Sequence, residues 1–166
     1  GKMVYKILNK ISSKGRWRIK KNFTVLEKMK QKNIYSKQIM NYFSHPKNVG
    51  VMKKYDGVGK VGNPVCGDVL WLYIKVGKNK KGEEIIADAK FQTLGCVVAI
   101  ANSSLLTELI IGKPIKEVEK ITQEDLIKKL GKVPPIKIHC SFLALDALKE
   151  AINDYQNKKT KNNRRA

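Results

Sequence analysis

A chain of 166 residues, of which 42% are hydrophobic, is long enough to bury the core of one domain. No apolar run reaches the roughly 20 residues that a membrane-spanning helix needs, so we expect a soluble protein that does not enter a membrane. The formal net charge of +20 lies mainly at the two ends, since residues 36–155 carry 18 basic and 13 acidic side chains. This distribution favours basic tails on a mildly basic domain and disfavours a nucleic-acid-binding face.

The basic ends divide the chain into three expected parts. Residues 1–34 contain many Lys, Arg and Ser residues and a single acid, Glu27. That composition is typical of an organelle-targeting presequence, and a solvated basic tail would share it. We therefore expect a presequence or flexible tail at 1–34, a folded domain at 35–155 and a basic tail at 156–166. Apolar residues are spread among the basic ones in the first part, including Trp17, Ile19, Phe23, Val25 and Leu26.

The first half of the central region predicts one helix followed by strands. Helically spaced apolar residues from Tyr35 to Phe43 predict a helix that ends at His45-Pro46. Residues 56–62 are rich in Gly and Val and should be extended. The near-continuous apolar run Val69–Val76 predicts a buried strand.

The strand at Val69–Val76 should form a hairpin with the segment that follows it. A polar stretch, Gly77–Glu84, predicts the turn of that hairpin. After it, Ile85, Ala87, Ala89 and Phe91 alternate with more polar positions, which predicts a half-buried strand.

The second half of the central region predicts helices. One spans Val97–Ile111 and is closed by Gly112 and Pro114, and a weaker one spans Gln123–Leu130. Strands followed by helices indicate an α+β fold, in which a small antiparallel sheet of about three strands packs against several helices. The last helix should be long, and its apolar stripe consists of Phe142, Leu145, Leu148, Ile152 and Tyr155.

Three cysteines, Cys66, Cys96 and Cys140, are the strongest candidates for chemistry. Their odd number argues against a closed disulfide framework, and their separations are too long for a paired-cysteine zinc knuckle. Free cysteines are most often small buried hydrophobic residues. These three, however, each lie at the boundary of a predicted element, beside glycines and polar residues.

The residues next to the cysteines extend the possible ligand set. Asp68 lies two positions after Cys66, and His139 immediately precedes Cys140. Cys96 and Cys140 are each expected just before a helix, where the helix dipole would lower the pKa of a thiol. Three thiolates, one carboxylate and one imidazole could hold Zn²⁺ or supply the four outer ligands of a [2Fe–2S] cluster. The spacing alone does not choose between these two metals.

Two further classes of function compete with a cluster site. A zinc-stabilised interaction module would use the same ligands structurally and would hold its metal firmly. A zinc hydrolase would need an open coordination position and a general base. Asp68 could act as that base, but no H-E-x-x-H motif supports a hydrolase.

Four segments in this order resemble the signature blocks of the IscU/NifU N-terminal scaffold family. The resemblance covers roughly Tyr35 to Tyr155. The chain departs from the family pattern at Val97-Val98, where Gly-Ser is usual, and at Phe142, where Met or Ile is usual. The four matching segments are 42–50 (YFSHPKNVG), 62–69 (GNPVCGDV), 91–96 (FQTLGC) and 134–141 (PPIKIHCS).

This resemblance implies a scaffold for a labile [2Fe–2S] cluster, not an enzyme. Members of the family accept persulfide sulfur from a cysteine desulfurase, whose activity they can modulate, and take up Fe²⁺. A ferredoxin supplies electrons, and frataxin regulates the complex. A J-protein and a heat-shock chaperone then drive transfer of the cluster to apo-proteins. The implied location is the mitochondrial matrix or a mitochondrion-related organelle.

The resemblance also implies roles for individual residues. Cys140 matches the persulfide acceptor. The cluster and metal site, with Zn²⁺ as an alternative resting metal, would consist of Cys66, Asp68, Cys96, His139 and Cys140. The chaperone recognition segment would consist of Val133, Pro134, Pro135, Ile136 and Lys137.

Overall fold

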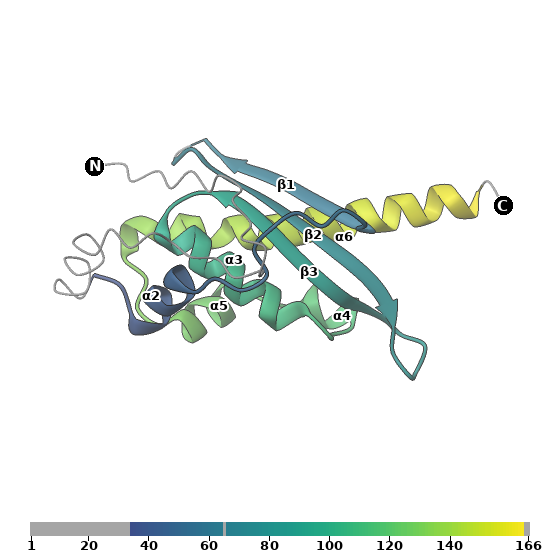
Figure 1. Ribbon diagram of the computed structural model, residues 1–166, viewed down its shortest axis with the longest axis horizontal. Helices are drawn as coiled ribbons and strands as arrows, with labels where there is room; N and C mark the ends of the chain where they lie inside the picture. The colour runs from purple at the N-terminus through teal and green to yellow at the C-terminus, as the bar shows by residue number, and fades with distance from the viewer. Residues whose placement is uncertain (1–33, 65, 165–166) are drawn as a thin grey trace, which may run out of the picture.

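The computed structural model describes residues 34–64 and 66–164 and has the α+β architecture that the sequence predicts (Figure 1). The predicted presequence, apart from Ile34, lies outside these residues. No helix in this part of the chain combines the length and apolar composition needed to cross a membrane. In chain order the elements are α2 (Lys37–Ser44), β1 (Gly57–Asn63), β2 (Asp68–Lys78), β3 (Glu84–Leu94), α3 (Val97–Ile110), α4 (Ile115–Val118), α5 (Gln123–Leu130), the 3-10 helix η1 (Pro135–Ser141) and α6 (Phe142–Asn163).

The three strands form one antiparallel sheet in the order β1-β2-β3, and α3 and α6 pack on the same face of it (Figure 1). Leu70, Leu72 and Ile74 of β2 point into this interface and are fully buried. The sequence predicts that β2 is buried throughout, but Val69 and Trp71 are 42% and 44% exposed. The prediction fails because helices cover only one face, so alternate residues of β2 face outward.

A β-bulge changes which residues of β3 face the core. Lys75 pairs with Asp88 while the next residue, Val76, pairs with Ile86, so Ala87 is the extra residue. The predicted alternation groups Ala87 with Ala89, but Ile86 and Ala89 are buried and Ala87 is exposed. A bulge shifts the alternation by one residue, which a simple period of two cannot anticipate.

Helix α6 lies directly against the backbone of β1. A Cβ atom placed on Gly57 would lie 2.2 Å from the carbonyl oxygen of Ala151, and one on Gly59 would lie 1.9 Å from that of Ala147. Only glycine permits this approach, since such distances are far below van der Waals contact. The two glycines therefore allow the long helix to pack closely on the sheet.

Both edges of the sheet are covered within the described residues. On β1, the amides of Val58 and Lys60 donate to the carboxylates of Asp154 and Glu150 on α6, each at 2.9 Å. On β3, the segment 48–50 exchanges backbone hydrogen bonds with Phe91. Covered edges leave few free backbone groups with which another strand could pair.

The last helix continues beyond the predicted stripe. The sequence separates a basic tail at 156–166 from a helix ending near Tyr155, but α6 runs to Asn163. Tyr155 donates a hydrogen bond to Glu84 at 2.8 Å, and Lys159 forms an ion pair with the same carboxylate at 2.5 Å. These contacts join the second half of α6 to the start of β3, so most of the predicted tail is helical.

Candidate metal centre

The strand pairing gathers the cysteine-bearing loops at one end of the sheet. Asn63 pairs with Asp68 across the β1–β2 hairpin, and Val69 pairs with Leu94 at the end of β3. The hairpin loop carries Cys66, and the residue pair after β3 carries Cys96. The two thiols are thus brought together by antiparallel register alone, although they are far apart in the sequence.

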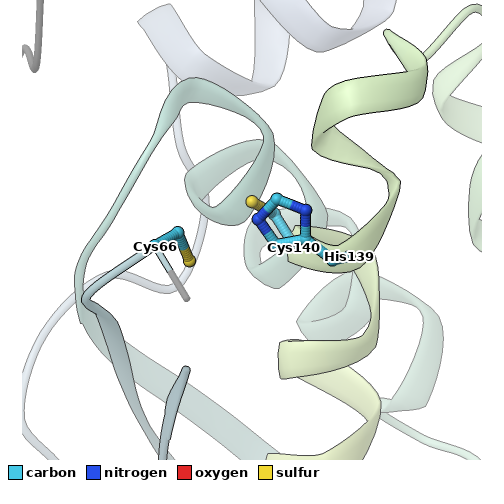
Figure 2. A group of neighbouring side chains, drawn as sticks. All are labelled: Cys66, His139 and Cys140. Carbon is cyan, nitrogen blue, oxygen red and sulfur yellow. The ribbon is translucent and has the colours of Figure 1, made fainter. Parts of the chain in front are cut away.

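The 3-10 helix η1 completes the group by adding His139 and Cys140. Figure 2 shows Cys66 from the hairpin loop beside His139 and Cys140. The ligand atoms of these three residues lie within 4.8 Å of one another, and so do those of Asp68, Cys96 and Cys140. Cys140 belongs to both groups. All five residues singled out from the sequence therefore meet at one site.

The burial of the five residues differs in a way that matters for chemistry. Cys66, Cys96 and His139 are half-buried, whereas Asp68 is 7% and Cys140 only 1% exposed. The Nε2 atom of His139 is buried and has no hydrogen-bond partner among the described residues. A buried ring nitrogen without a partner is costly, and a bound metal ion would satisfy it. This observation fits a ligand role for His139.

Asp68 also has a structural contact inside the site. The backbone amide of Cys96 donates a hydrogen bond to Asp68 Oδ2 at 3.3 Å. A Cβ atom on Gly95 would lie 3.3 Å from the same oxygen and 2.9 Å from the Cβ of Ala99. The glycine therefore allows the carboxylate to approach the N-terminus of α3. Asp68 is placed both to hold this loop and to reach a metal.

The pKa of the Cys96 thiol is lowered. A hydrogen bond from the Cys140 thiol lowers the pKa of Cys96 to about 7, against the opposing effect of burial. Backbone amides of Ala99 and Val98 at the start of α3 lower the pKa further, as expected at a helix N-terminus. Deprotonation of Cys96 is therefore favoured relative to an ordinary thiol.

Cys140 behaves in the opposite way, which corrects one prediction. The sequence places Cys140 immediately before the last helix and predicts a lowered pKa. In the structure Cys140 lies within η1, and α6 begins at Phe142. Its hydrogen bond to Cys96, burial and the nearby negative charges all raise the pKa of Cys140. The prediction fails because the hydrogen bond to Cys96, burial and the nearby negative charges decide the pKa of this thiol.

Two neighbours of the site were not identified as such from the sequence. Tyr35, just before α2, packs against the cluster formed by Val98, Ala99 and Cys140. Burial and the negative charge of Cys96 raise the pKa of its phenol. Val98, one of the two departures from the family pattern, is fully buried beside Cys140. Tyr35 is remote in sequence from every cysteine, so no local pattern could reveal this contact.

The predicted chaperone segment, residues 133–137, leads into η1 beside the metal centre. Ile136 is 78% exposed, while Val133 is half-buried against the core. Ile138 and Phe142, on either side of the two ligand residues of η1, are 39% and 48% exposed. The helix η1 and the first residue of α6 thus present apolar side chains to solvent.

Comparison with known sequences identifies the class of this fold and site. The profile of the NifU-like N terminal domain matches residues 34–162. The chain belongs to this family. Of the helices and strands described above, the match omits only Asn163, the last residue of α6.

Several relatives are about half identical to this chain. The iron-sulfur cluster assembly scaffold protein IscU of Buchnera aphidicola subsp. Schizaphis graminum is 52% identical over 131 residues, which cover 77% of this chain and 98% of that protein. IscU 1 of Archaeoglobus fulgidus is 50% identical over 128 residues, covering 77% and 80%. The iron sulfur cluster assembly protein 1 of Encephalitozoon cuniculi is 51% identical over 127 residues, covering 75% and 87%.

Solved structures share the same architecture. An N-terminal NifU-like protein from Brucella abortus aligns with a TM-score of 0.62 at 18% identity, covering 75% of this chain and 96% of that one. A putative iron-sulfur cluster assembly scaffold protein for the SUF system from Fervidobacterium islandicum aligns with a TM-score of 0.57 at 26% identity, covering 71% and 96%. The first likeness shows the fold alone.

Proposed function

We propose that this chain is a scaffold on which an iron–sulfur cluster is assembled and from which it passes to apo-proteins. The observation that carries the proposal is the meeting of three thiols, one carboxylate and one imidazole in two groups that share Cys140. Relatives named as cluster assembly scaffolds, about 50% identical over most of the chain, support the same function. The chain would act as a carrier and not as an enzyme.

The number and kind of donors suit a [2Fe–2S] cluster that is held temporarily. Such a cluster needs four outer ligands, and the site offers five donors. A hard carboxylate binds iron less firmly than a thiolate in a sulfur-rich site. Asp68 would therefore be the ligand most easily exchanged when the cluster leaves. It would also admit Fe²⁺, which accepts oxygen donors, before sulfide arrives.

Sulfur would arrive as a persulfide on a cysteine desulfurase, with Cys140 as acceptor. The Cys140 thiolate attacks the terminal sulfur of the donor persulfide, the donor's S–S bond breaks, and the donor thiolate leaves. Cys140 then carries the new persulfide. Because Cys140 is 1% exposed and its pKa is raised, this step requires that η1 move outward and that the thiol lose its proton.

Delivery would use the segment 133–137. Pro134 precedes η1 in an extended conformation, while Ile136 is exposed on η1 and Lys137 supplies a positive charge, so a chaperone groove would bind this segment once η1 opens. A peptide of residues 133–137 should stimulate the ATPase of the cognate heat-shock chaperone, and Lys137→Ala should weaken that stimulation. Equal stimulation by full-length chain carrying Lys137→Ala and Pro135→Ala would exclude this segment.

The same proposal includes the remaining partners and the location. A ferredoxin would supply electrons, frataxin would regulate assembly, and a J-protein would bring the chaperone. The compartment would be the mitochondrial matrix or a mitochondrion-related organelle. Its basis is the basic composition of residues 1–34.

A zinc-stabilised interaction module is the alternative, because Cys66, His139 and Cys140 alone could hold Zn²⁺. Anaerobic incubation with iron and sulfide, followed by visible absorption and transfer to an apo-ferredoxin, separates the two. We expect a chromophore that forms and then leaves with the acceptor protein. A site that keeps Zn²⁺ under these conditions, and whose thermal stability falls sharply when zinc is chelated, would contradict the scaffold function.

A further inference from the structure

The helix η1 carries two of the five ligand residues but has few apolar anchors of its own. Of its seven residues only Cys140 and Ser141 are buried. Ile136 and Ile138 are exposed instead of packed. Segments with little buried apolar surface open at low free energy, so other interactions must hold η1 in place.

Those interactions are hydrogen bonds that converge on Ser141. The Asn102 side chain on α3 donates to the Ser141 carbonyl at 2.8 Å. The side-chain amide of Gln123 on α5 donates to Ser141 Oγ at 2.9 Å and to the Ile138 carbonyl at 3.2 Å. Ser141 Oγ itself donates to the Ile138 carbonyl at 2.5 Å. We refer to these four residues, Asn102, Gln123, Ile138 and Ser141, as the Ser141 network.

Asn102 lowers the stability of the fold at its buried position in α3. It is fully buried in α3, and its Oδ1 atom has no hydrogen-bond partner among the described residues. A buried amide with one unsatisfied end is less stable than an apolar side chain in the same place. Its one bond to another element is to Ser141, next to Cys140. The loss of stability at Asn102 is explained if its hydrogen bond to Ser141 is needed to position the ligand residues His139 and Cys140.

Other buried polar residues of α3 serve a different part of the molecule. Thr107 Oγ1 accepts a hydrogen bond from Asn48 at 3.1 Å, and Ser104 Oγ accepts one from the amide of Lys47 at 2.7 Å. Both bonds fix the loop before β1, away from η1. Thr107 is therefore a matched control for Asn102, because both are fully buried polar residues on the same helix.

We propose that Asn102 and Gln123 are positioning residues that keep η1 closed through the Ser141 network and thereby set how often Cys140 becomes accessible to a reactant. The inference deepens the proposed function, since a buried thiol must be exposed to accept sulfur from a persulfide. The persulfide donor would be a protein cysteine, whose approach needs η1 to leave α3 and α5. The strength of the network then limits the rate at which the site can be loaded.

The test measures how fast each cysteine of the metal-free, full-length chain reacts with dilute iodoacetamide, by mass spectrometry at constant pH. Under these conditions the rate follows the population of the open state. Gln123→Ala should raise the Cys140 rate about fivefold, the factor that corresponds to one hydrogen bond of roughly 1 kcal/mol. Asn102→Ala should raise it by a similar factor, because it removes the hydrogen bond from α3 to the Ser141 carbonyl.

Cys66 in the same chain and Thr107→Val in a separate chain are the controls. A general loss of stability would accelerate the reaction of Cys66 and of Cys140 with iodoacetamide together. Thr107→Val should show the size of any such general effect. The proposal predicts instead that the ratio of the Cys140 rate to the Cys66 rate rises in Gln123→Ala and Asn102→Ala but not in Thr107→Val. An unchanged ratio in Gln123→Ala would overturn it. The alkylation experiment uses the metal-free chain, so its outcome does not depend on cluster assembly. Failure of cluster assembly would refute the proposed function but would leave the measured alkylation rates unaffected.

Discussion

The two ends of the molecule are held together by different means. Where α6 crosses β1, the backbones touch at Gly57 and Gly59, and buried Ala147 and Ala151 fill the contact. At the metal centre, loops and a 3-10 helix are held mainly by hydrogen bonds around buried polar groups. The α6–β1 contact resembles an ordinary close-packed core, whereas the metal centre retains buried polar groups that lower the stability of the fold. Stability and proposed function are thus separated in space, so substitutions at the two ends should have different effects.

The largest effect on folding should come from Gly59→Ala. Its Cβ would lie 1.9 Å from the carbonyl oxygen of Ala147, and neither backbone can move without separating α6 from the sheet. Overpacking of this kind costs several kcal/mol, so we expect the free energy of unfolding to fall by about 3 kcal/mol or more. Urea denaturation followed by circular dichroism measures this change.

Gly62→Ala on the same strand is the matched control. Its Cβ would meet Val69 Cγ1 at 3.5 Å, an ordinary contact. We expect its free energy of unfolding to change by less than about 1 kcal/mol, partly because alanine restricts the unfolded chain. Equal stabilities for the two variants would show that the close approach of α6 to β1 is not the source of rigidity at this end.

At the metal centre, Asp68→Asn should change the behaviour of the cluster more than the fold. The asparagine Oδ1 can still accept the hydrogen bond from the Cys96 amide, so stability should fall by less than about 1 kcal/mol. Without the exchangeable carboxylate, the three thiolates and His139 would hold the cluster. We expect a longer-lived cluster and slower delivery to an apo-ferredoxin.

The comparison variant for that experiment is Asp68→Ala, which removes the carboxylate and the hydrogen bond together. It should also slow delivery, but with an added stability loss of about 1 kcal/mol. Visible absorbance decay gives the lifetime, acceptor absorbance gives the transfer rate, and thermal unfolding gives the stability. A short-lived cluster in a stable Asp68→Asn protein would end the argument that this carboxylate is a labile ligand.

The last predicted effect is on the pH dependence of stability in the metal-free protein. The folded pKa of Cys96, about 7, is below its ordinary value of 9.0, so its ionisation stabilises the fold increasingly between about pH 7 and pH 9. The pKa of Cys140 is raised, so its contribution is complete below about pH 9 and is lost at higher pH. The free energy of unfolding should therefore be greatest near pH 9.

Denaturant titrations at several pH values would measure this profile in the native chain and in Cys96→Ser. The serine variant should lose the rise between about pH 7 and pH 9, since serine does not ionise in this range. An identical rise in the variant would assign the ionisation to another group.

The sequence predicted the elements with strong periodicity and the residues with strong chemistry. The helices α2, α3 and α5 begin and end within two residues of their expected bounds, because caps and glycines mark them clearly. The five candidate ligands were chosen for their donor chemistry, and the strand register brings them together. Sequence patterns were therefore sufficient where neighbouring residues in the chain decide the conformation of a segment.

Features that depend on tertiary contacts were not predictable. The bulge at Ala87, the close approach at Gly59 and the packing of Tyr35 on the cysteines all need the partner element to be in place. No pattern in the sequence predicted an element between α5 and α6, so η1 and the different environment of Cys140 were missed. The sequence predicted the lowered pKa of Cys96 from its place before α3, whereas the raised pKa of Cys140 depends on its tertiary contact with Cys96.

The most direct test of the central claim is the visible spectrum after anaerobic reconstitution with iron and sulfide. It compares the native chain with Cys66→Ser, Cys96→Ser and Cys140→Ser, and uses Thr107→Val, whose side chain accepts a hydrogen bond from Asn48 and not from a ligand residue, as a control. Because three thiolates at one site are required, each serine variant should fail to form a stable [2Fe–2S] chromophore, while the control should form it fully. A full native spectrum in Cys96→Ser would contradict the assignment of a shared cluster site.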